Sequence, residues 1–149
     1  MRIALCICPQ WSVQTPSFAI GSLKSHIKNK DVEVEQFDLN IRTSLYTKEK
    51  HIEKFWDWGN DTPWNSEANF KDEILPHFKD LWHEYIDKLA EYDVVAFTTY
   101  ISNIVTTDYI ARYLKQKNPK IQIWYGGPYS WYAESAGLVE NDNYREYVD

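Results

Sequence analysis

The sequence lacks what a nucleic-acid-binding or membrane-spanning protein needs. It has only 16 Lys and Arg against 22 Asp and Glu, a net charge of −6, whereas a surface that binds phosphates requires a basic face. No stretch approaches the roughly 20 apolar residues that cross a bilayer. The apolar run at the start is too short for a signal peptide and ends at Pro9. We therefore expect a cytoplasmic protein that binds neither nucleic acid nor membrane.

Cysteine is also scarce. The only two, Cys6 and Cys8, are separated by one residue within an apolar run, so in a strand both side chains point to the same face. A metal pair usually needs a turn between its ligands and two further Cys or His nearby. Packing as small buried thiols is the favoured interpretation, and a metal pair is the alternative.

The motifs of several enzyme classes are missing as well. The sequence contains no Gly-x-Gly-x-x-Gly, no Walker loop and no Cys-x-x-x-Cys-x-x-Cys cluster. A hydrolase that used Cys6 or Cys8 as its nucleophile would lack a partner base. We assign no catalytic residue and no metal ligand, and the chain carries no complete catalytic site.

Aromatic residues, by contrast, are abundant: 7 Trp, 11 Tyr and 6 Phe make up 16% of the chain. Aromatics at this density fill an enlarged core or a surface that meets a flat apolar partner. Four indoles fall between residues 41 and 92, more than two covering helices need: Trp56, Trp58, Trp64 and Trp82. We expect part of this segment to be a docking face.

The hydrophobic pattern predicts strands at residues 2–8, 32–39, 93–97, 121–125 and 144–148. Helices are expected at 16–30, 69–92, 105–117 and 132–140. In the first, Phe18, Ile20, Leu23 and Ile27 recur at helical spacing, and in the second Pro76 bends or restarts the helix.

This order predicts one α/β domain over residues 1–149. It is a doubly wound, Rossmann-like or flavodoxin-like parallel sheet of about five strands, with helices on both faces. A helical insertion at about 41–92 precedes the third strand. Because the sequence ends as the last strand begins, we expect it to be the amino-terminal segment of a longer protein.

Ligands of such sheets bind outside the carboxyl ends of the strands. Three segments are expected to meet there: residues 9–17, 98–103 and 126–130. Each alone is typical of a turn or a helix cap, but together they indicate a binding site. The expected cofactor-binding residues are Trp11, Thr98, Thr99, Tyr100, Ser102, Asn103, Gly126, Gly127 and Pro128.

These motifs resemble a known family. A strand followed by Thr98-x-Tyr100-x-Ser102, and a later strand followed by Gly126-Gly127, resemble the cobalamin-binding domain of corrinoid enzymes. With residues 16–23, 37–40 and 125–128, nearly the whole chain is similar to the amino-terminal domain of cobalamin-dependent radical-SAM enzymes. The resemblance implies that Thr98 and Ser102 line the pocket for the nucleotide tail of the cofactor. It also implies that the two glycines let the tail pass, with Gly127 facing the two hydroxyl residues.

One motif of the family is missing. Classical corrinoid domains carry Asp-x-His-x-x-Gly after the first strand, where the His coordinates cobalt, and residues 9–16 contain no His. The radical-SAM branch commonly lacks it, and a domain that has lost the cofactor would lack it too. Trp11 could pack against the lower face of the corrin or plug the groove.

The resemblance therefore implies a cobalamin-binding module of a radical-SAM enzyme, such as a methyltransferase, which presents the cofactor for methyl transfer or related radical chemistry. Its partner would be a downstream radical-SAM domain that holds S-adenosylmethionine and an iron–sulfur cluster. The alternative is a flavodoxin-like or receiver-like interaction domain without a tetrapyrrole. Cys8-Pro9 and Thr98-Thr99 do not supply the acidic residues of a receiver, and residues 9–15 resemble a flavodoxin phosphate loop only weakly.

Overall fold

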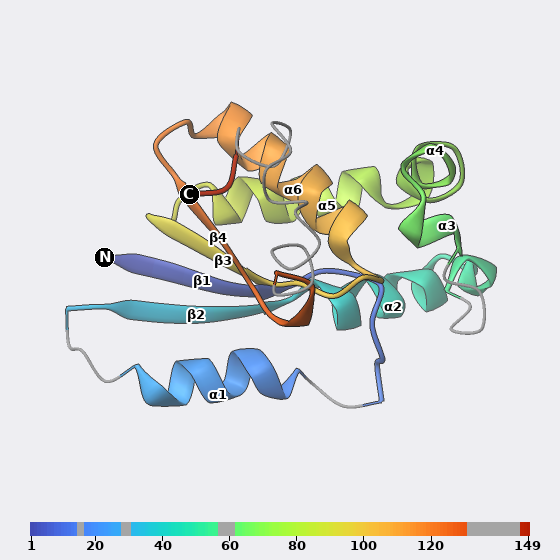
Figure 1. Cartoon of the computed structure of the whole chain (residues 1–149). Helices are drawn as coiled ribbons and strands as arrows, with labels where there is room; N and C mark the ends of the chain where they lie inside the picture. Colours follow the sequence, from blue (N-terminus) through green and yellow to red (C-terminus); the bar gives the residue numbers. More distant parts are fainter. Residues whose placement is uncertain (15–16, 28–30, 57–61, 131–146) are drawn as a thin grey trace.

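Strands and helices alternate in the computed structural model, which describes residues 1–14, 17–27, 31–56, 62–130 and 147–149 (Figure 1). The strands are β1 (Arg2–Ile7), β2 (Glu33–Asp38), β3 (Val94–Thr98) and β4 (Gln122–Gly126). The α-helices are α1 (Phe18–His26), α2 (Leu39–Glu49), α3 (Thr62–Asn65), α4 (Glu67–Asn69), α5 (Leu75–Leu89) and α6 (Ile104–Lys117), with a 3-10 turn η1 (Glu53–Phe55) and a π-helix η2 (Phe70–Ile74). Within these described ranges, no helix is both long enough and apolar enough to span a membrane.

The four described strands form one parallel sheet in the order β2-β1-β3-β4. The doubly wound α/β class is thus confirmed, with four strands found where about five were expected. The expected strand 144–148 falls mostly outside the described residues, as does the expected helix 132–140. Asp149 is described, and its N–H donates to the carbonyl of Ile123 at 2.8 Å. The end of the chain therefore lies along β4, where a fifth strand would add.

Alternation of side chains explains how each strand is buried. β1 is covered on both faces, because Ala4 and Cys6 pack toward one core and Ile3 and Leu5 toward the other. In β4, only alternate side chains reach the core: Ile123 is buried, whereas Trp124 is 42% exposed. The outermost position of β2 agrees with its alternating sequence.

The first face of the sheet carries the main core, beneath α2, α5 and α6 (Figure 1). Five α5 side chains at steps of three and four are buried: Phe78, Leu81, Trp82, Ile86 and Leu89. α6 adds Ile110 and Leu114 above Val95 and Ile123. Burial of each such side chain contributes about 1.5–3 kcal/mol, so this layer supplies most of the stability.

Two of the four indoles of the insertion lie in the core and do not contribute to the expected docking face, which stays a prediction for the rest of the segment. Trp64 and Trp82 are buried, and their indole N–H groups donate to the Phe55 carbonyl at 3.2 Å and to the Thr43 hydroxyl at 3.0 Å. They are core residues because η2 and the short helices add a further layer that two covering helices would not provide. Trp56 is half-buried against Trp64, and Trp58 lies outside the described residues.

Of the two outcomes expected for Pro76, the restart is observed: Pro76 lies in the first turn of α5, a position that suits a residue without an N–H. The preceding turns are the short α4, capped by the Ser66 hydroxyl, and the π-helical segment η2. The expected long helix is therefore three consecutive pieces.

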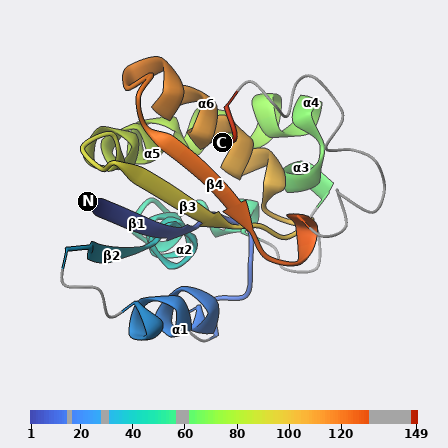
Figure 2. The ribbon, with the colours of Figure 1, turned by 60° about the vertical axis from the view of Figure 1, so that its left-hand side comes forward.

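On the second face of the sheet, the described residues cover only one half. α1 packs on β1 and β2, and its Ile20 joins Ile3, Leu5, Ile7 and Val94 in a smaller core. Figure 2 shows α1 at one side of the sheet, with β3 and β4 extending past it. Among the described elements, none covers β3 and β4 on this side.

One ionisable side chain lies between α6 and β4. Asp108 accepts a hydrogen bond from the Tyr125 hydroxyl at 2.8 Å. Burial raises the pKa of this carboxyl from 3.8 to about 6, although the Tyr125 hydroxyl and Arg112 oppose the shift. The folded protein therefore favours the neutral acid.

Because the folded pKa of Asp108 is raised, its stabilising effect is complete below about pH 4 and is lost as the pH rises through 6. Two pKa units correspond to about 3 kcal/mol as an upper bound. Asp108→Asn keeps an acceptor for Tyr125 and removes the titration, so the stability of the wild type relative to this variant should fall between pH 4 and 6. Urea denaturation at several pH values measures this difference. Asp80→Asn, which removes an exposed carboxylate, is the control, and a pH-independent difference for Asp108→Asn would contradict the assignment.

Candidate functional site

The three loops at the carboxyl edge of the sheet are joined by direct hydrogen bonds. The Ser102 hydroxyl donates to the carbonyl of Gln10 at 2.7 Å, which ties the loop after β3 to the loop after β1. The Thr99 N–H and hydroxyl both donate to the carbonyl of Gly126, at 2.7 and 2.8 Å, which ties the same loop to the end of β4. The segments expected to meet at this edge do meet.

Asn103 holds the centre of this edge. Its buried carboxamide donates to the carbonyls of Cys8 at 3.3 Å and Thr98 at 3.1 Å, and accepts from the N–H of Tyr100 at 2.8 Å. Ser102, Thr99 and Asn103 therefore join the loops through their polar groups. Their contact with a cofactor stays a prediction.

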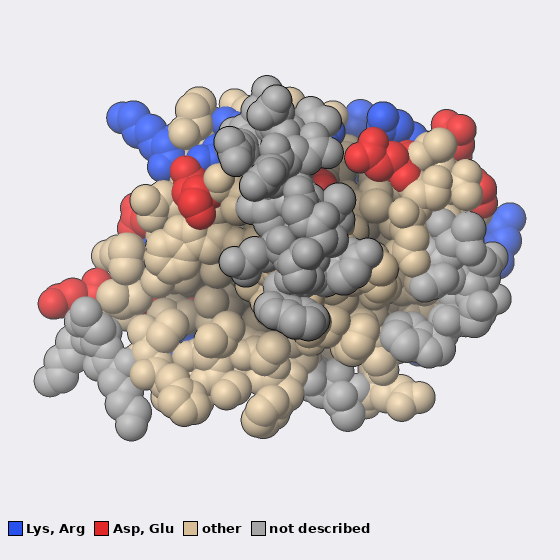
Figure 3. Space-filling view, in the orientation of Figure 1, with Lys and Arg blue, Asp and Glu red and all other residues tan. Residues whose placement is uncertain are grey.

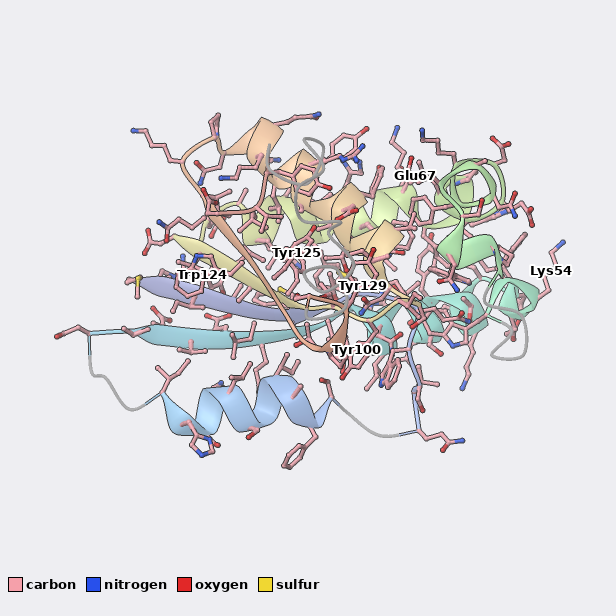
Figure 4. The ribbon with its side chains drawn as sticks, in the orientation of Figure 1. Lys54, Glu67, Tyr100, Trp124, Tyr125 and Tyr129 are labelled. Atoms are coloured by element: carbon pink, nitrogen blue, oxygen red, sulfur yellow. The ribbon has the colours of Figure 1, made fainter. Side chains whose placement is uncertain are left out.

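An aromatic pair stands on the outer side of these loops. The rings of Trp11 and Tyr100 stack with centroids 4.0 Å apart and planes 15° apart. A recess of about 260 Å³ adjoins them, lined by Trp11, Tyr100, Ile101, Pro128 and Tyr129; Figure 4 labels Tyr100 and Tyr129 side by side near the end of β4. The pair offers a flat apolar surface at the rim.

The position of Trp11 depends on Asn40, a residue that we did not assign to the site from the sequence. Its carboxamide accepts from the Trp11 N–H at 2.8 Å and donates to the Ser12 carbonyl at 3.1 Å. Asn40 is the second residue of α2, which begins at Leu39 after Asp38, and the Asp38 carboxylate caps that helix by accepting from the Ile41 N–H at 2.8 Å. The Asp38-Leu39-Asn40 sequence was a usable signal, because it follows the carboxyl end of β2.

A groove of about 520 Å³ lies between α1 and the part of the sheet that α1 does not cover. Below, we call it the α1 groove. Its described lining is Leu5, Phe18, Ala19, Ile20, Ser22, Leu23, Ala96, Phe97, Thr98, Tyr100, Trp124, Tyr125, Gly126, Gly127 and Pro128. None of these described side chains is an acid, a base or a thiol, so the described lining of the groove carries no charge.

Small side chains make the floor of the α1 groove. Ala96 and Thr98 on β3 and Gly126 on β4 point to the same face, and Thr98 lies directly opposite Gly126 in the parallel register. Among the described residues, the Thr98 hydroxyl has no hydrogen-bond partner. A ligand in the groove would find one uncommitted hydroxyl there.

Five of the nine expected cofactor-binding residues line this groove, and a sixth lies beside it. Thr98, Tyr100, Gly126, Gly127 and Pro128 are in its wall or floor. Trp11 lines the adjoining recess, and the other three are the loop-joining residues described above.

The two glycines have different roles. A Cβ on Gly126 would meet no atom within 4 Å, so the absence of a side chain at this position leaves open space in the groove. Gly127 has φ of +98°, and a Cβ there would lie 2.8 Å from the Thr99 carbonyl oxygen. Gly127 thus lies against Thr98 and Thr99, and the packing of this loop requires its lack of a side chain.

The two thiols lie on the opposite side of the sheet from the groove. Cys6 and Cys8 are buried in the main core and face the same side, as expected from their spacing. Burial raises the pKa of both, to about 12 for Cys8. Within the described parts of the chain, no three His, Cys, Asp or Glu side chains lie close enough to hold a metal ion.

Comparisons of the chain with protein-family models, with curated proteins and with solved structures gave no match. The function proposed below therefore rests on the fold and on the α1 groove.

The geometry of Gly126 and Gly127 predicts that replacing each with alanine has opposite effects on the stability of the protein. Gly127→Ala should destabilise the protein by about 2 kcal/mol or more, because a left-handed backbone penalises a Cβ and this one also meets backbone. Gly126→Ala should be neutral or stabilising by up to about 1 kcal/mol, since it restricts the unfolded chain at an unhindered position. Thermal denaturation of the two variants measures this, and equal losses of stability would contradict it.

Proposed function

We propose that this domain binds cobalamin and is the cofactor module of a radical-SAM enzyme. The observation that carries the proposal is the α1 groove, floored by Ala96, Thr98 and Gly126 and open at the carboxyl ends of β3 and β4. This is the edge where parallel sheets of this type receive their ligands. The nucleotide tail would lie in the groove, and the rest of the cofactor would lie at the rim.

The residues present fit such a ligand in three respects. The uncharged lining suits a flat heteroaromatic base. The Thr98 hydroxyl supplies a hydrogen bond, and the missing side chain of Gly126 supplies room. The stacked Trp11 and Tyr100 give the corrin an apolar surface to lie against.

The loop after β1 determines whether the protein could supply a ligand to cobalt. Residues 9–16 contain no His, so the protein supplies no imidazole to the metal from this loop. When bound, the cofactor supplies a cobalt centre that can carry a methyl group. This chain's residues would orient it, and the radical-SAM domain implied by the resemblance would provide S-adenosylmethionine and the iron–sulfur cluster.

One observation favours the alternative, an interaction domain of the same fold without a cofactor. Trp124 in the groove wall is 42% exposed and Leu23 of α1 is 52% exposed. Apolar groups exposed together are typical of protein-binding surfaces. A cofactor titration separates the two functions.

Hydroxocobalamin added to the purified protein should bind with a change in visible absorbance that lacks the signature of His coordination. Gly126→Leu should abolish binding, because the added side chain fills the groove. Thr98→Val, which removes one hydrogen bond worth about 0.5–1.5 kcal/mol, should weaken binding by a factor of about ten or less. Thr106→Val is the matched control, since Thr106 lies on α6 and does not line the groove.

Circular dichroism should first establish that each variant is folded. No absorbance change at saturating hydroxocobalamin would contradict cofactor binding and favour the interaction domain. Unchanged affinity of Gly126→Leu would show that the tail does not run along the groove.

A further inference from the structure

Residues 147–149 lie against the outer edge of β4, between this strand and α6 (Figures 1 and 2). The Asp149 N–H donates to the Ile123 carbonyl at 2.8 Å, and the Ile123 N–H donates to the Asp149 carboxylate, also at 2.8 Å. The neighbouring Gln122 directs its N–H to the Asp93 carbonyl on the β3 side, so the backbone groups of Ile123 point to the outer side. Asp149 thus satisfies both of these groups, as a neighbouring strand would.

Tyr147 holds the same segment from the side of α6. It is 5% exposed and packs in the main core, and the Arg112 guanidinium lies 5.3 Å from the centre of its ring. The Tyr147 hydroxyl is within hydrogen-bonding reach of the Asp108 carboxyl, which also accepts from the Tyr125 hydroxyl. Burial raises the pKa of Tyr147 to about 12, so its hydroxyl keeps its proton at neutral pH. The segment is therefore joined to α6 and β4 through one buried carboxyl.

A carboxyl group thus holds each end of the segment, and basic side chains of α6 lie beside both. Lys115 donates to the Asp149 carboxylate at 2.7 Å, and Arg112 lies close to Asp108. In Figure 3 acidic and basic side chains lie close together along the upper edge of the molecule, where Figure 1 has α5 and α6. The described titratable and charged side chains near Asp108 are Arg112 on α6, Tyr125 on β4, Tyr147, Glu67 on α4 and Cys8 after β1.

The two carboxyls respond to pH in opposite directions. Burial raises the pKa of Asp108 from 3.8 to about 6, although the two tyrosine hydroxyls and the nearby guanidinium oppose the shift. Undocking of Tyr147 returns this carboxyl to water, so docking is favoured while Asp108 is protonated. Burial also opposes the ionisation of Asp149, but Lys115 and the Ile123 N–H outweigh it and lower the pKa of Asp149 below 3.8. Docking is therefore favoured while Asp149 is charged.

We propose that residues 147–149 act as a pH-sensitive latch on the edge of β4, closed most firmly in mildly acidic solution and looser on either side. The contribution of Asp108 to closure is complete below about pH 4 and is lost as the pH rises through about 6. The contribution of Asp149 is complete above about pH 4 and is lost as the pH falls through its lowered pKa. Closure is therefore strongest near pH 4.

Opening of the latch changes the edge of the sheet. It removes the partners of the Ile123 N–H and carbonyl, and an edge strand with unpaired backbone groups can pair with a further strand. The pH therefore controls whether this edge is available. The described lining of the α1 groove includes none of residues 147–149, so the latch is independent of the proposed cofactor.

Amide hydrogen exchange of the full chain, followed by NMR between pH 3 and 7.5, measures closure. The protection factors of the Ile123 and Asp149 amides, in which each rate is divided by its intrinsic value at that pH, should be largest near pH 4. They should fall about tenfold or more by pH 7, within the roughly 100-fold that two pKa units allow. Asp108→Asn should abolish this fall, because it removes the titration. Asp80→Asn, at an exposed position on α5, should leave the profile unchanged.

Asp149→Asn tests the other end of the latch. Its carboxamide can still accept from the Ile123 N–H, but the ion pair with Lys115 is lost, so protection of Ile123 should be lower at neutral pH and no longer fall below pH 4. Low concentrations of urea should accelerate exchange of the Val95 amide, at the centre of the sheet, and leave that of Ile123 unchanged, because the latch opens locally. Wild-type protection that is constant between pH 4 and 7, an equal fall in Asp108→Asn, or a response of Ile123 to urea that matches Val95 would overturn the proposal.

Discussion

The carboxamide of Asn103 sets the geometry of the carboxyl edge of the sheet. The last carbonyls of β1 and β3 emerge where the strand ladder has ended, and buried carbonyls without a donor are costly. Asn103 satisfies those of Cys8 and Thr98 with one amide group and holds the N–H of Tyr100 with its oxygen. Tyr100 is thereby fixed where its ring can stack on Trp11. The stacked aromatic pair at the rim is therefore a consequence of this one buried amide.

A second constraint is the unequal covering of the two faces of the sheet. The face under α5 and α6 is closed by large side chains, whereas β3 and β4 carry Ala96, Thr98 and Gly126 on the other face. Apolar surface that remains in water forgoes about 25 cal/mol per Å². Any occupant that covers Trp124 and the floor beside it gains this free energy. The same physical property therefore bears on both proposed functions, the cofactor module and the interaction domain.

The sequence was sufficient to predict most of the fold, because buried parallel strands such as β1 and β3 are continuous apolar runs. It also placed the three loops at one edge. The sequence did not distinguish the roles of Gly126 and Gly127, because these depend on the φ angle of Gly127 and on the position of the Thr99 carbonyl. Nor did it separate Phe18 from Ile20, because residues two apart in a helix lie on opposite sides and only the fold decides which side meets the sheet.

The polar residues of the rim show a related limit. Thr98 and Thr99 are adjacent and chemically identical, yet only Thr98 faces the α1 groove, while Thr99 bonds to Gly126. Side chains alternate between the two faces of a strand. A shift of one position therefore decides whether a threonine faces the ligand site or bonds to the neighbouring strand. The strand was expected to end at residue 97 and ends at Thr98. An uncertainty of one residue at the end of a strand is therefore enough to exchange the two roles.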